Sequence, residues 1–180
     1  MEKRRFPLAQ AEGVARELAE LLTPACERIQ IAGSLRRRKA TVGDIELLCI
    51  PRPLENHLFY RDALDQLLRG RLMPEGVLTP RINQKGSHTY GPLNKLLLHV
   101  GSGTPVDVFS AGLENWGMAL LVRTGSAEFN IRVMSRFREL GMRGHAYGGV
   151  HTPTGYVACP DEDTVFRLLG WPFMPPEERT

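Results

Sequence analysis

The sequence predicts an α+β fold, in which a mixed or antiparallel sheet is covered by helices and is followed by a small lobe of helices and a hairpin. Two observations support this class. Four segments have the short, apolar, turn-bounded character of strands, and longer segments before and after them repeat apolar residues at helical spacing. The expected strands are residues 27–32, 44–50, 93–100 and 105–110.

The first helix is expected over residues 8–22. Val14, Leu18, Leu21 and Leu22 recur at helical spacing there, and Pro24 follows as a stop. The apolar stripe of this amphipathic helix should cover one face of the sheet.

The expected strands are separated by clear breaks. Residues 27–32 run directly into Gly33-Ser34. A helix is expected over residues 58–68, after the prolines that end the second strand. The turn Gly101-Ser102-Gly103 is expected to join the last two strands into a hairpin.

The character of the chain changes after Ser110. Helices are expected over residues 114–122, 127–140 and 161–169, with short strands within 143–157 and an extended, proline-rich tail over 172–180. We therefore expect two units, a catalytic layer of residues 1–110 and a smaller lobe of residues 111–180.

Length, composition and cysteine content limit the kinds of protein that this chain can be. A chain of 180 residues with 42% hydrophobic content and a formal net charge of +3 has enough material for one well-packed core with an appended lobe. The three cysteines suggest neither a disulfide framework nor a zinc site. No apolar run is long enough to span a membrane, and the start does not resemble a signal peptide. We expect a soluble, cytoplasmic, monomeric protein with no membrane partner.

Three acidic residues are the candidate catalytic and metal-binding groups. Asp44 and Glu46 lie two positions apart on a strand, so both point to the same face. Like charges so close are costly unless a cation neutralises them, and hard divalent ions prefer carboxylate oxygens. Asp107 stands among apolar neighbours in a later strand and is the candidate third ligand.

A phosphate-binding turn precedes these acids. Glycine at position 33 lets the backbone approach a phosphate, Ser34 adds a hydroxyl and an amide donor, and Arg37 adds a cation. A phosphate cradle followed by a metal-binding acidic pair is what phosphoryl-type transfer requires.

Several motifs, in this order, resemble the DNA polymerase X family, which includes DNA polymerase beta. They are Gly33-Ser34-Leu35-Arg36-Arg37, Gly43-Asp44-Ile45-Glu46, Val106-Asp107-Val108, and Arg123-Thr124-Gly125-Ser126 with Phe129-Asn130. The ending, from Glu162-Asp163 to Pro175-Pro176-Glu177, also resembles the end of that family. The resemblance covers nearly the whole chain.

This resemblance implies a polymerase beta-like nucleotidyltransferase palm in which Asp44, Glu46 and Asp107 hold two Mg²⁺ ions, with Mn²⁺ as an alternative. The residues implied to bind the nucleotide and its triphosphate are Gly33, Ser34, Arg37, Gly43, Thr124, Gly125 and Asn130. The late lobe would be the nucleotide-selecting subdomain, similar to thumb or fingers. The implied partners are a dNTP and primer-template or gapped DNA. The chain would be a minimal form that lacks the family's N-terminal helical domain and its lyase activity.

Three positions depart from the family pattern. Glu46 stands where many members carry aspartate, Val122-Arg123 stands where polymerase beta-like members have two aromatic residues that help to reject ribonucleotides, and Met134 replaces an arginine that probes the template side. The remaining cations of the first motif, Arg36, Arg38 and Lys39, are expected to supply general electrostatics from a solvated turn.

Three functions are therefore considered. The first is a minimal family X DNA polymerase that adds dNMP from dNTP to a primer 3′-OH in gap filling or DNA repair. The second keeps the chemistry but transfers NMP to RNA, a protein or a small molecule. This alternative stays open because Val122-Arg123 replaces the aromatic pair that helps to reject ribonucleotides. The third is a catalytically silent nucleic-acid-binding module, against which the three retained carboxylates argue.

Overall fold

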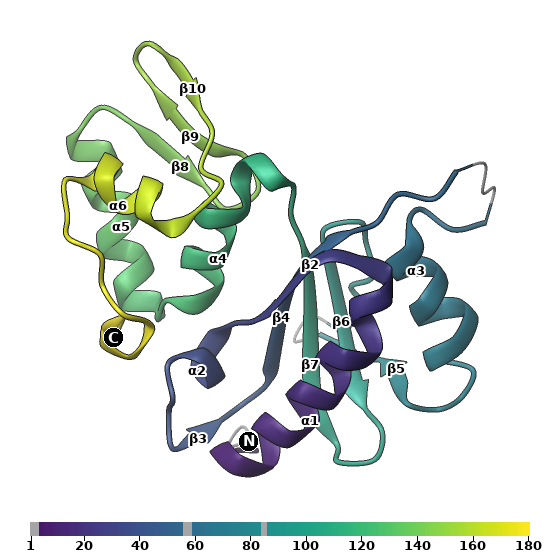
Figure 1. Ribbon diagram of the computed structural model, residues 1–180. Coiled ribbons are helices and arrows are strands. Elements are labelled where there is room, and N and C mark those ends of the chain that lie inside the picture. The colour runs from purple at the N-terminus through teal and green to yellow at the C-terminus, as the bar shows by residue number, and fades with distance from the viewer. Residues whose placement is uncertain (1–3, 56–58, 84–85) are drawn as a thin grey trace.

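The computed structural model describes residues 4–55, 59–83 and 86–180, and it folds as two lobes. The first lobe holds a five-stranded sheet of order β2-β4-β7-β6-β5, and the second holds a three-stranded sheet of order β10-β9-β8 (Figure 1). The expected α+β class with a mixed sheet and a helix-hairpin lobe is confirmed.

The four expected strands of the first lobe lie close to their predicted positions, as β2, β4, β6 and β7, whereas β1, β3 and β5 were not predicted. The strands of this lobe are β1 (Phe6–Pro7), β2 (Cys26–Ile31), β3 (Thr41–Val42), β4 (Ile45–Pro51), β5 (Leu78–Pro80), β6 (Asn94–His99) and β7 (Thr104–Ser110). In the five-stranded sheet β4 and β7 run parallel, whereas the other neighbouring pairs run antiparallel. A crossover therefore separates β4 from β7 along the chain.

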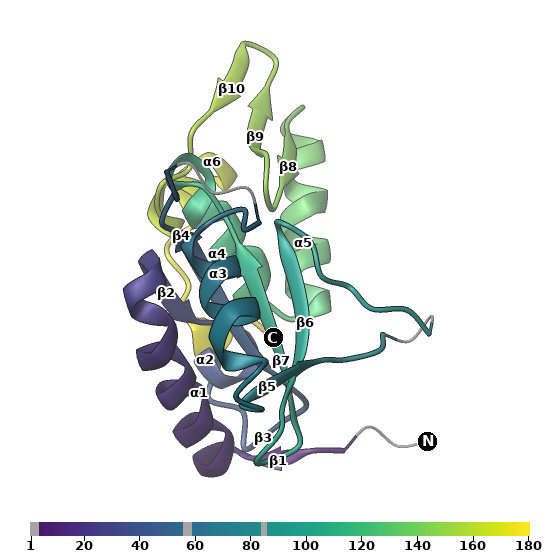
Figure 2. The ribbon, with the colours of Figure 1, turned by 90° about the vertical axis from the view of Figure 1, so that its right-hand side faces the viewer.

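The first helix has the bounds that its apolar spacing predicts. Helix α1 (Leu8–Leu22) ends where the short 3-10 turn η1 (Thr23–Ala25), with Pro24 inside it, begins. Ala11, Ala15, Leu18 and Leu22 are its fully buried residues and pack in the core beneath the sheet. Figure 2 shows α1 and α3 on the same side of the sheet.

The second helix begins later than the predicted residue 58, which lies outside the described residues. Helix α3 spans Ala63–Leu67 and continues as a π-helical turn, η2, over Leu68–Leu72. Asp62 starts the helix because its side chain accepts a hydrogen bond from the backbone N–H of Asp65 at 2.7 Å. The N-cap at Asp62, and not the apolar pattern before it, therefore determines where the helix begins.

The second lobe contains the predicted helices and short strands. Its elements are η3 (Leu113–Asn115), α4 (Trp116–Thr124), α5 (Ala127–Glu139), β8 (Arg143–His145), β9 (Gly149–Thr152), β10 (Gly155–Val157), α6 (Glu162–Leu169) and η4 (Pro176–Glu178). Ser126 caps α5 by accepting from the N–H of Phe129 at 3.0 Å. The tail, expected to be extended throughout, turns once at η4.

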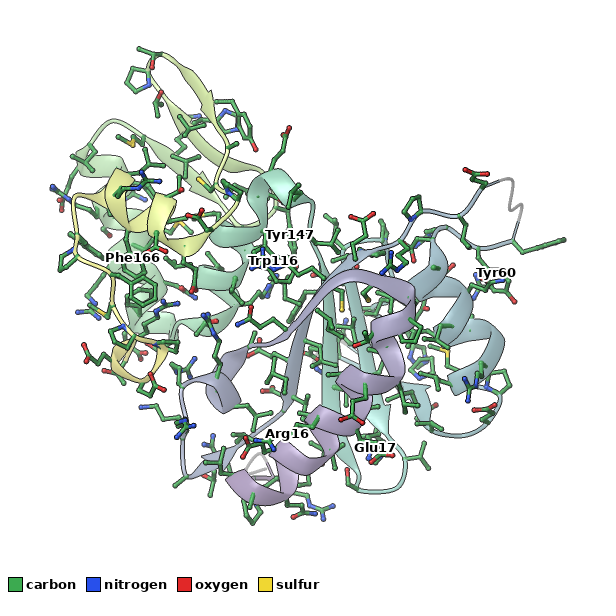
Figure 3. All side chains as sticks on the ribbon, viewed as in Figure 1. Arg16, Glu17, Tyr60, Trp116, Tyr147 and Phe166 are labelled. Atoms are coloured by element: carbon green, nitrogen blue, oxygen red, sulfur yellow. The ribbon has the colours of Figure 1, made fainter. Side chains whose placement is uncertain are left out.

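A shared apolar cluster joins the two lobes. Ala32, Leu48 and Phe109 of the first lobe pack with Trp116 and Leu120 of α4. The indole of Trp116 is fully buried at this junction (Figure 3). The second lobe is therefore docked on the face of the sheet that α1 and α3 leave uncovered. Among the described residues no helix has the length and apolar character needed to cross a membrane.

Candidate active site

Glu46 and Asp107 lie side by side on the two parallel strands. The register pairs Glu46 of β4 with Asp107 of β7. The residues that alternate with them along β4 and β7 are buried in the core on the helical side, so both carboxylates point to the opposite face. The parallel pairing thus brings together two acids that are far apart in the sequence.

The predicted phosphate-binding turn lies directly against Glu46. Gly33 begins the short helix α2 (Gly33–Arg36) with a φ of 64°. A Cβ atom at this position would lie 1.9 Å from Oε2 of Glu46. The backbone N–H of Ala32 also donates to the carbonyl oxygen of Glu46 at 2.8 Å. Glycine is therefore required here both for the left-handed backbone and for the close approach.

The three predicted acids share one electrostatic environment. Burial and the negative charges of Asp44 and Asp107 together raise the pKa of Glu46 to about 7, and the charges of Arg123 and Arg37 partly oppose the shift. A carboxyl group that resists ionisation beside two other acids is the setting in which a divalent cation would be stabilising.

The donor set suits a hard divalent ion, although the side chains are not gathered into a ligand sphere. Within the part of the chain that the structure describes, no three His, Cys, Asp or Glu side chains come close enough together to hold a metal ion. Asp107 is instead hydrogen-bonded and ion-paired through Oδ1 to Nη2 of Arg81 at 2.5 Å. Metal ligation by Asp44, Glu46 and Asp107 therefore stays a prediction.

Arg37 connects the phosphate turn to the second lobe. Its Nη1 donates to the carbonyl oxygen of Thr124 at the end of α4. Desolvation lowers the pKa of its guanidinium, and the nearby charges of Glu46 and Asp44 oppose that shift. Arg37 is thus a half-buried cation beside the acids. Ser34 is half-buried in the same turn.

The other predicted nucleotide-binding residues lie where α4 meets α5. Gly125 ends α4, and a Cβ atom on it would lie 2.6 Å from Oδ1 of Asn130. The Nδ2 of Asn130 donates to the carbonyl oxygen of Val122 at 2.8 Å, while its Oδ1 is buried without a hydrogen-bond partner in the described structure. Asn130 is therefore held in place with one acceptor unused. Gly43 is buried immediately before Asp44.

One interaction that the sequence did not indicate ties the phosphate turn to the second lobe. Arg36 donates to both carboxylate oxygens of Glu162, at 2.8 and 2.7 Å, and to Oγ1 of Thr124 at 2.7 Å. Arg179 donates to the same carboxylate at 2.5 and 3.3 Å and is fully buried. The expectation that Arg36 acts only through general electrostatics in a solvated turn is wrong, because its guanidinium is half-buried between the lobes.

Arg123 makes a second connection between the lobes. Its guanidinium lies 3.7 Å from the ring centre of Phe109, and its Nη2 donates to the hydroxyl of Tyr147 at 2.6 Å. That hydroxyl in turn donates to Oδ1 of Asn94 on β6 at 2.5 Å. Tyr147 lies at the lobe junction in Figure 3. Arg123 is therefore held by Phe109 and Tyr147, and its positive charge lowers the pKa of Glu46.

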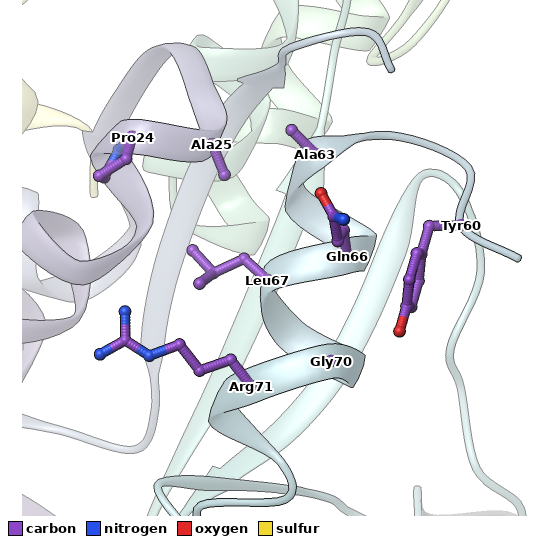
Figure 4. A pocket seen from close by; sticks show the side chains of 8 residues that line it. All are labelled: Pro24, Ala25, Tyr60, Ala63, Gln66, Leu67, Gly70 and Arg71. Carbon is purple, nitrogen blue, oxygen red and sulfur yellow. The ribbon is translucent and has the colours of Figure 1, made fainter. Parts of the chain in front are cut away.

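A hollow of about 420 Å³ lies elsewhere, on the helical side of the sheet. It is lined by residues of η1, α3 and η2 with Tyr60 at one edge (Figure 4). None of its lining residues is acidic. The hollow is therefore separate from the site formed by Glu46 and Asp107.

Comparison with known proteins finds similarity to DNA polymerases. Residues 119–180 match the family model described as DNA polymerase beta thumb. DNA polymerase lambda of Rattus norvegicus is 27% identical over an alignment that covers 97% of this chain and 32% of that protein. The chain thus spans about a third of the length of this curated relative.

Two solved structures share the fold. The ternary gap complex of Leishmania infantum polymerase beta superposes with a TM-score of 0.79 at 20% identity, over 98% of this chain and 71% of the other. The ternary P/T complex of the same polymerase gives a TM-score of 0.72 at 20% identity, over 98% and 77% of the two chains. At 20% identity these two structures show that the chain shares the fold of polymerase beta, and residues 119–180 are similar to its thumb.

Proposed function

We propose that this chain catalyses metal-dependent nucleotidyl transfer to DNA, adding dNMP from dNTP to a primer 3′-OH in gap filling or repair. The observation that carries the proposal is the direct pairing of Glu46 with Asp107 against Gly33. Two acids at one face of a sheet, with a phosphate-compatible turn in contact, match the needs of phosphoryl-type transfer. A DNA substrate would also imply an intracellular protein.

The proposed roles follow from these positions. Asp44, Glu46 and Asp107 would hold two divalent cations, which when bound neutralise phosphate charge and favour loss of the acceptor proton. Ser34 and the backbone of Gly33 and Gly43 would meet the triphosphate. With the acceptor hydroxyl held in line with the α-phosphate, little further side-chain chemistry is needed.

The second lobe would position the nucleotide. We propose that residues 1–110 act as the palm and residues 111–180 as the nucleotide-selecting subdomain. Asn130, with an unused buried acceptor, and Gly125, which leaves room for it, would contact the sugar or the base. Arg37, bonded to Thr124, would connect a bound triphosphate to this lobe. The partners would be dNTP and primer-template or gapped DNA, bound by a monomer.

A second candidate keeps the transfer but changes the acceptor to RNA, a protein or a small molecule. The observation that favours it is Arg123, whose guanidinium stacks on Phe109 and bonds to Tyr147 near the acids. A fixed cation at this position would give the proposed sugar pocket a different charge and shape from the two aromatic residues of polymerase beta-like members. Discrimination between deoxyribose and ribose is therefore the property on which the two candidates differ most.

Primer extension tests the proposal. Labelled primers on gapped, recessed and template-free substrates are incubated with dNTPs or NTPs and with Mg²⁺ or Mn²⁺. The wild-type chain should extend the primer in a template-directed manner, and Asp107→Ala should reduce the rate by about 1,000-fold or more, since it removes a metal ligand.

The matched control is Glu17→Ala, which removes an exposed acid from α1, away from the site (Figure 3). This variant should keep wild-type activity. Absence of incorporation on every nucleic acid, with tight binding of metal and NTP retained, would favour the second candidate. Full activity of Asp107→Ala would show that Asp107 is not a metal ligand.

A further inference from the structure

A single row of residues crosses the sheet through the candidate site. The register places Glu46 opposite Asp107, and Asp107 opposite Leu96 of β6. One residue past β5, the backbone N–H of Arg81 donates to the carbonyl oxygen of Leu96 at 3.1 Å. Residues directly opposite one another on adjacent strands share a face. Arg81 therefore stands on the same face as both acids, at the end of their row.

The side chain of Arg81 reaches past Leu96 to Asp107. Its Nη2 lies 2.5 Å from Oδ1 of Asp107, and the two side chains are 24% and 14% exposed. The Nε of Arg81 is buried and makes no hydrogen bond within the described residues. An arginine on an outer strand can extend into water, so a guanidinium turned inward at the cost of an unpaired N–H is held there by the carboxylate.

Stability alone does not account for such a pair. A partly buried ion pair contributes little net free energy of folding relative to apolar side chains of similar size. Its clearest physical effect is geometric, because a planar guanidinium holds a carboxylate in one orientation. Arg37 and Arg123 lie near enough to Glu46 for their charges to lower its pKa. Arg81 thus completes a set of cations arranged around the acids.

We propose that Arg81 is a positioning residue for the proposed metal site, because it holds the carboxylate of Asp107 on the face of the sheet that it shares with Glu46, where a divalent cation would bind. The inference rests on the proposed function, since it assigns Asp107 as a ligand. It adds a residue from a further element, the segment that continues β5, to the proposed site. Partners of this kind, one step removed from the metal, typically contribute about 10- to 100-fold in metal affinity or activity.

The test compares Arg81→Gln, Arg81→Lys and wild type in two measurements. Binding of Mn²⁺ alone, without nucleotide or DNA, is followed by electron paramagnetic resonance titration, and kcat and KM for dNTP are measured by primer extension. Arg81→Gln should weaken Mn²⁺ binding and lower kcat by about 10- to 100-fold, with KM for dNTP changed less than about twofold. Arg81→Lys should recover part of both losses because it restores the charge without the fork.

Arg69→Gln is the matched control, since Arg69 pairs with the buried Asp65 at 3.6 Å on the helical side of the same lobe. It should leave both measurements unchanged. Thermal unfolding with a chelator verifies that each variant is folded. Wild-type Mn²⁺ affinity in folded Arg81→Gln, or an equal loss in Arg69→Gln, overturns the inference.

The two proposals fail in different ways. If the wild-type chain transfers no nucleotide but Arg81→Gln still weakens Mn²⁺ binding, the proposed function falls and the role of Arg81 stands. If the wild-type chain binds no Mn²⁺, both fall.

Discussion

At the scale of single residues, the charge state of Glu46 depends on its neighbours. The group ionises near pH 4.5 when exposed and near 7 when folded. Between these values the native state holds a proton that the unfolded state has lost, so raising the pH favours unfolding. A divalent cation that replaces the proton would remove this cost.

We therefore expect the stability of the metal-free protein to decrease with rising pH through this window. The contribution of Glu46 to the free energy of unfolding should fall by about 3 kcal/mol, at about 1.4 kcal/mol for each pKa unit. The measurement is urea unfolding with a chelator from pH 4 to 8, and Glu46→Gln should lack this component. A wild-type curve that runs parallel to that of Glu46→Gln would refute the expected shift.

Gly33 makes a second prediction at this scale. Gly33→Ala places a Cβ atom against the Glu46 carboxylate and strains a left-handed backbone. Gly76→Ala is the matched control, because Gly76 has a φ of 73° and no atom within 4 Å of its would-be Cβ. Gly76→Ala should cost about 1–2 kcal/mol through backbone strain alone, whereas Gly33→Ala should cost at least about 2 kcal/mol more.

The check is chemical unfolding of both variants, together with primer extension. Gly33→Ala should also abolish nucleotide transfer, and Gly76→Ala should retain it. Equal destabilisation of the two variants would mean that the clash with Glu46 is relieved without cost.

At the scale of elements, α2 and α6 are joined by a buried cluster of charges. Glu162, near the start of α6, receives hydrogen bonds from Arg36 of α2 and from Arg179 of the tail. These bonds lower the pKa of Glu162 despite the opposing effect of its burial. Helix α2, which carries the predicted phosphate-binding turn, is therefore fixed relative to the second lobe.

Glu162→Ala should destabilise the protein by about 3–5 kcal/mol, because it leaves two guanidinium groups buried without their counter-ion. Glu177→Ala is the control, since its pair with Arg38 is exposed and 3.8 Å long, and it should cost less than about 0.5 kcal/mol. Thermal and urea unfolding of both variants make the comparison. A small effect of Glu162→Ala would show that the guanidinium groups find other partners.

Elements with a strong local pattern were predictable from the sequence. The spacing of Leu18 and Leu22 and the proline stop predicted α1 to the residue, and alternation placed Glu46 on the face opposite Leu47. The start of α3 was missed because a cap at Asp62, and not apolar spacing, determines it.

The long-range ion pairs were not predictable. Arg36 bonds to Glu162 across 126 positions, and Arg81 bonds to Asp107 across 26. Periodicity indicates which face a side chain occupies, but carries no information on which distant charge meets it there. Arg36 and Arg81 therefore became visible only when the sheet and the second lobe were assembled.

At the scale of the whole molecule, the second lobe offers a cationic surface away from the acids. Arg138 and Arg143 line a hollow of about 580 Å³ together with Met134 and Met142. No ion pair joins either arginine to another residue in the described ranges. Such a surface suits the phosphate backbone of DNA.

We expect the double variant Arg138→Ala with Arg143→Ala to bind DNA more weakly, to a similar extent for every sequence. The slope of log K against log salt should become shallower by about 2, one for each phosphate that the arginines no longer neutralise. Fluorescence anisotropy at several salt concentrations measures this slope. Arg16→Ala, which removes an exposed cation from α1 (Figure 3), should leave the slope unchanged. An unchanged slope in the double variant would exclude these arginines from the DNA interface.

The parallel pairing of β4 with β7 also has a consequence for how the protein folds. After Glu46 the chain must pass through α3, β5 and β6 before it reaches Asp107. Contacts between residues far apart in sequence form late because closing a long loop costs entropy, and here the closing step also brings two negative charges together. A chain in which β4 and β7 have not yet paired therefore lacks the juxtaposition of Glu46 and Asp107 on which the proposed divalent-ion site depends.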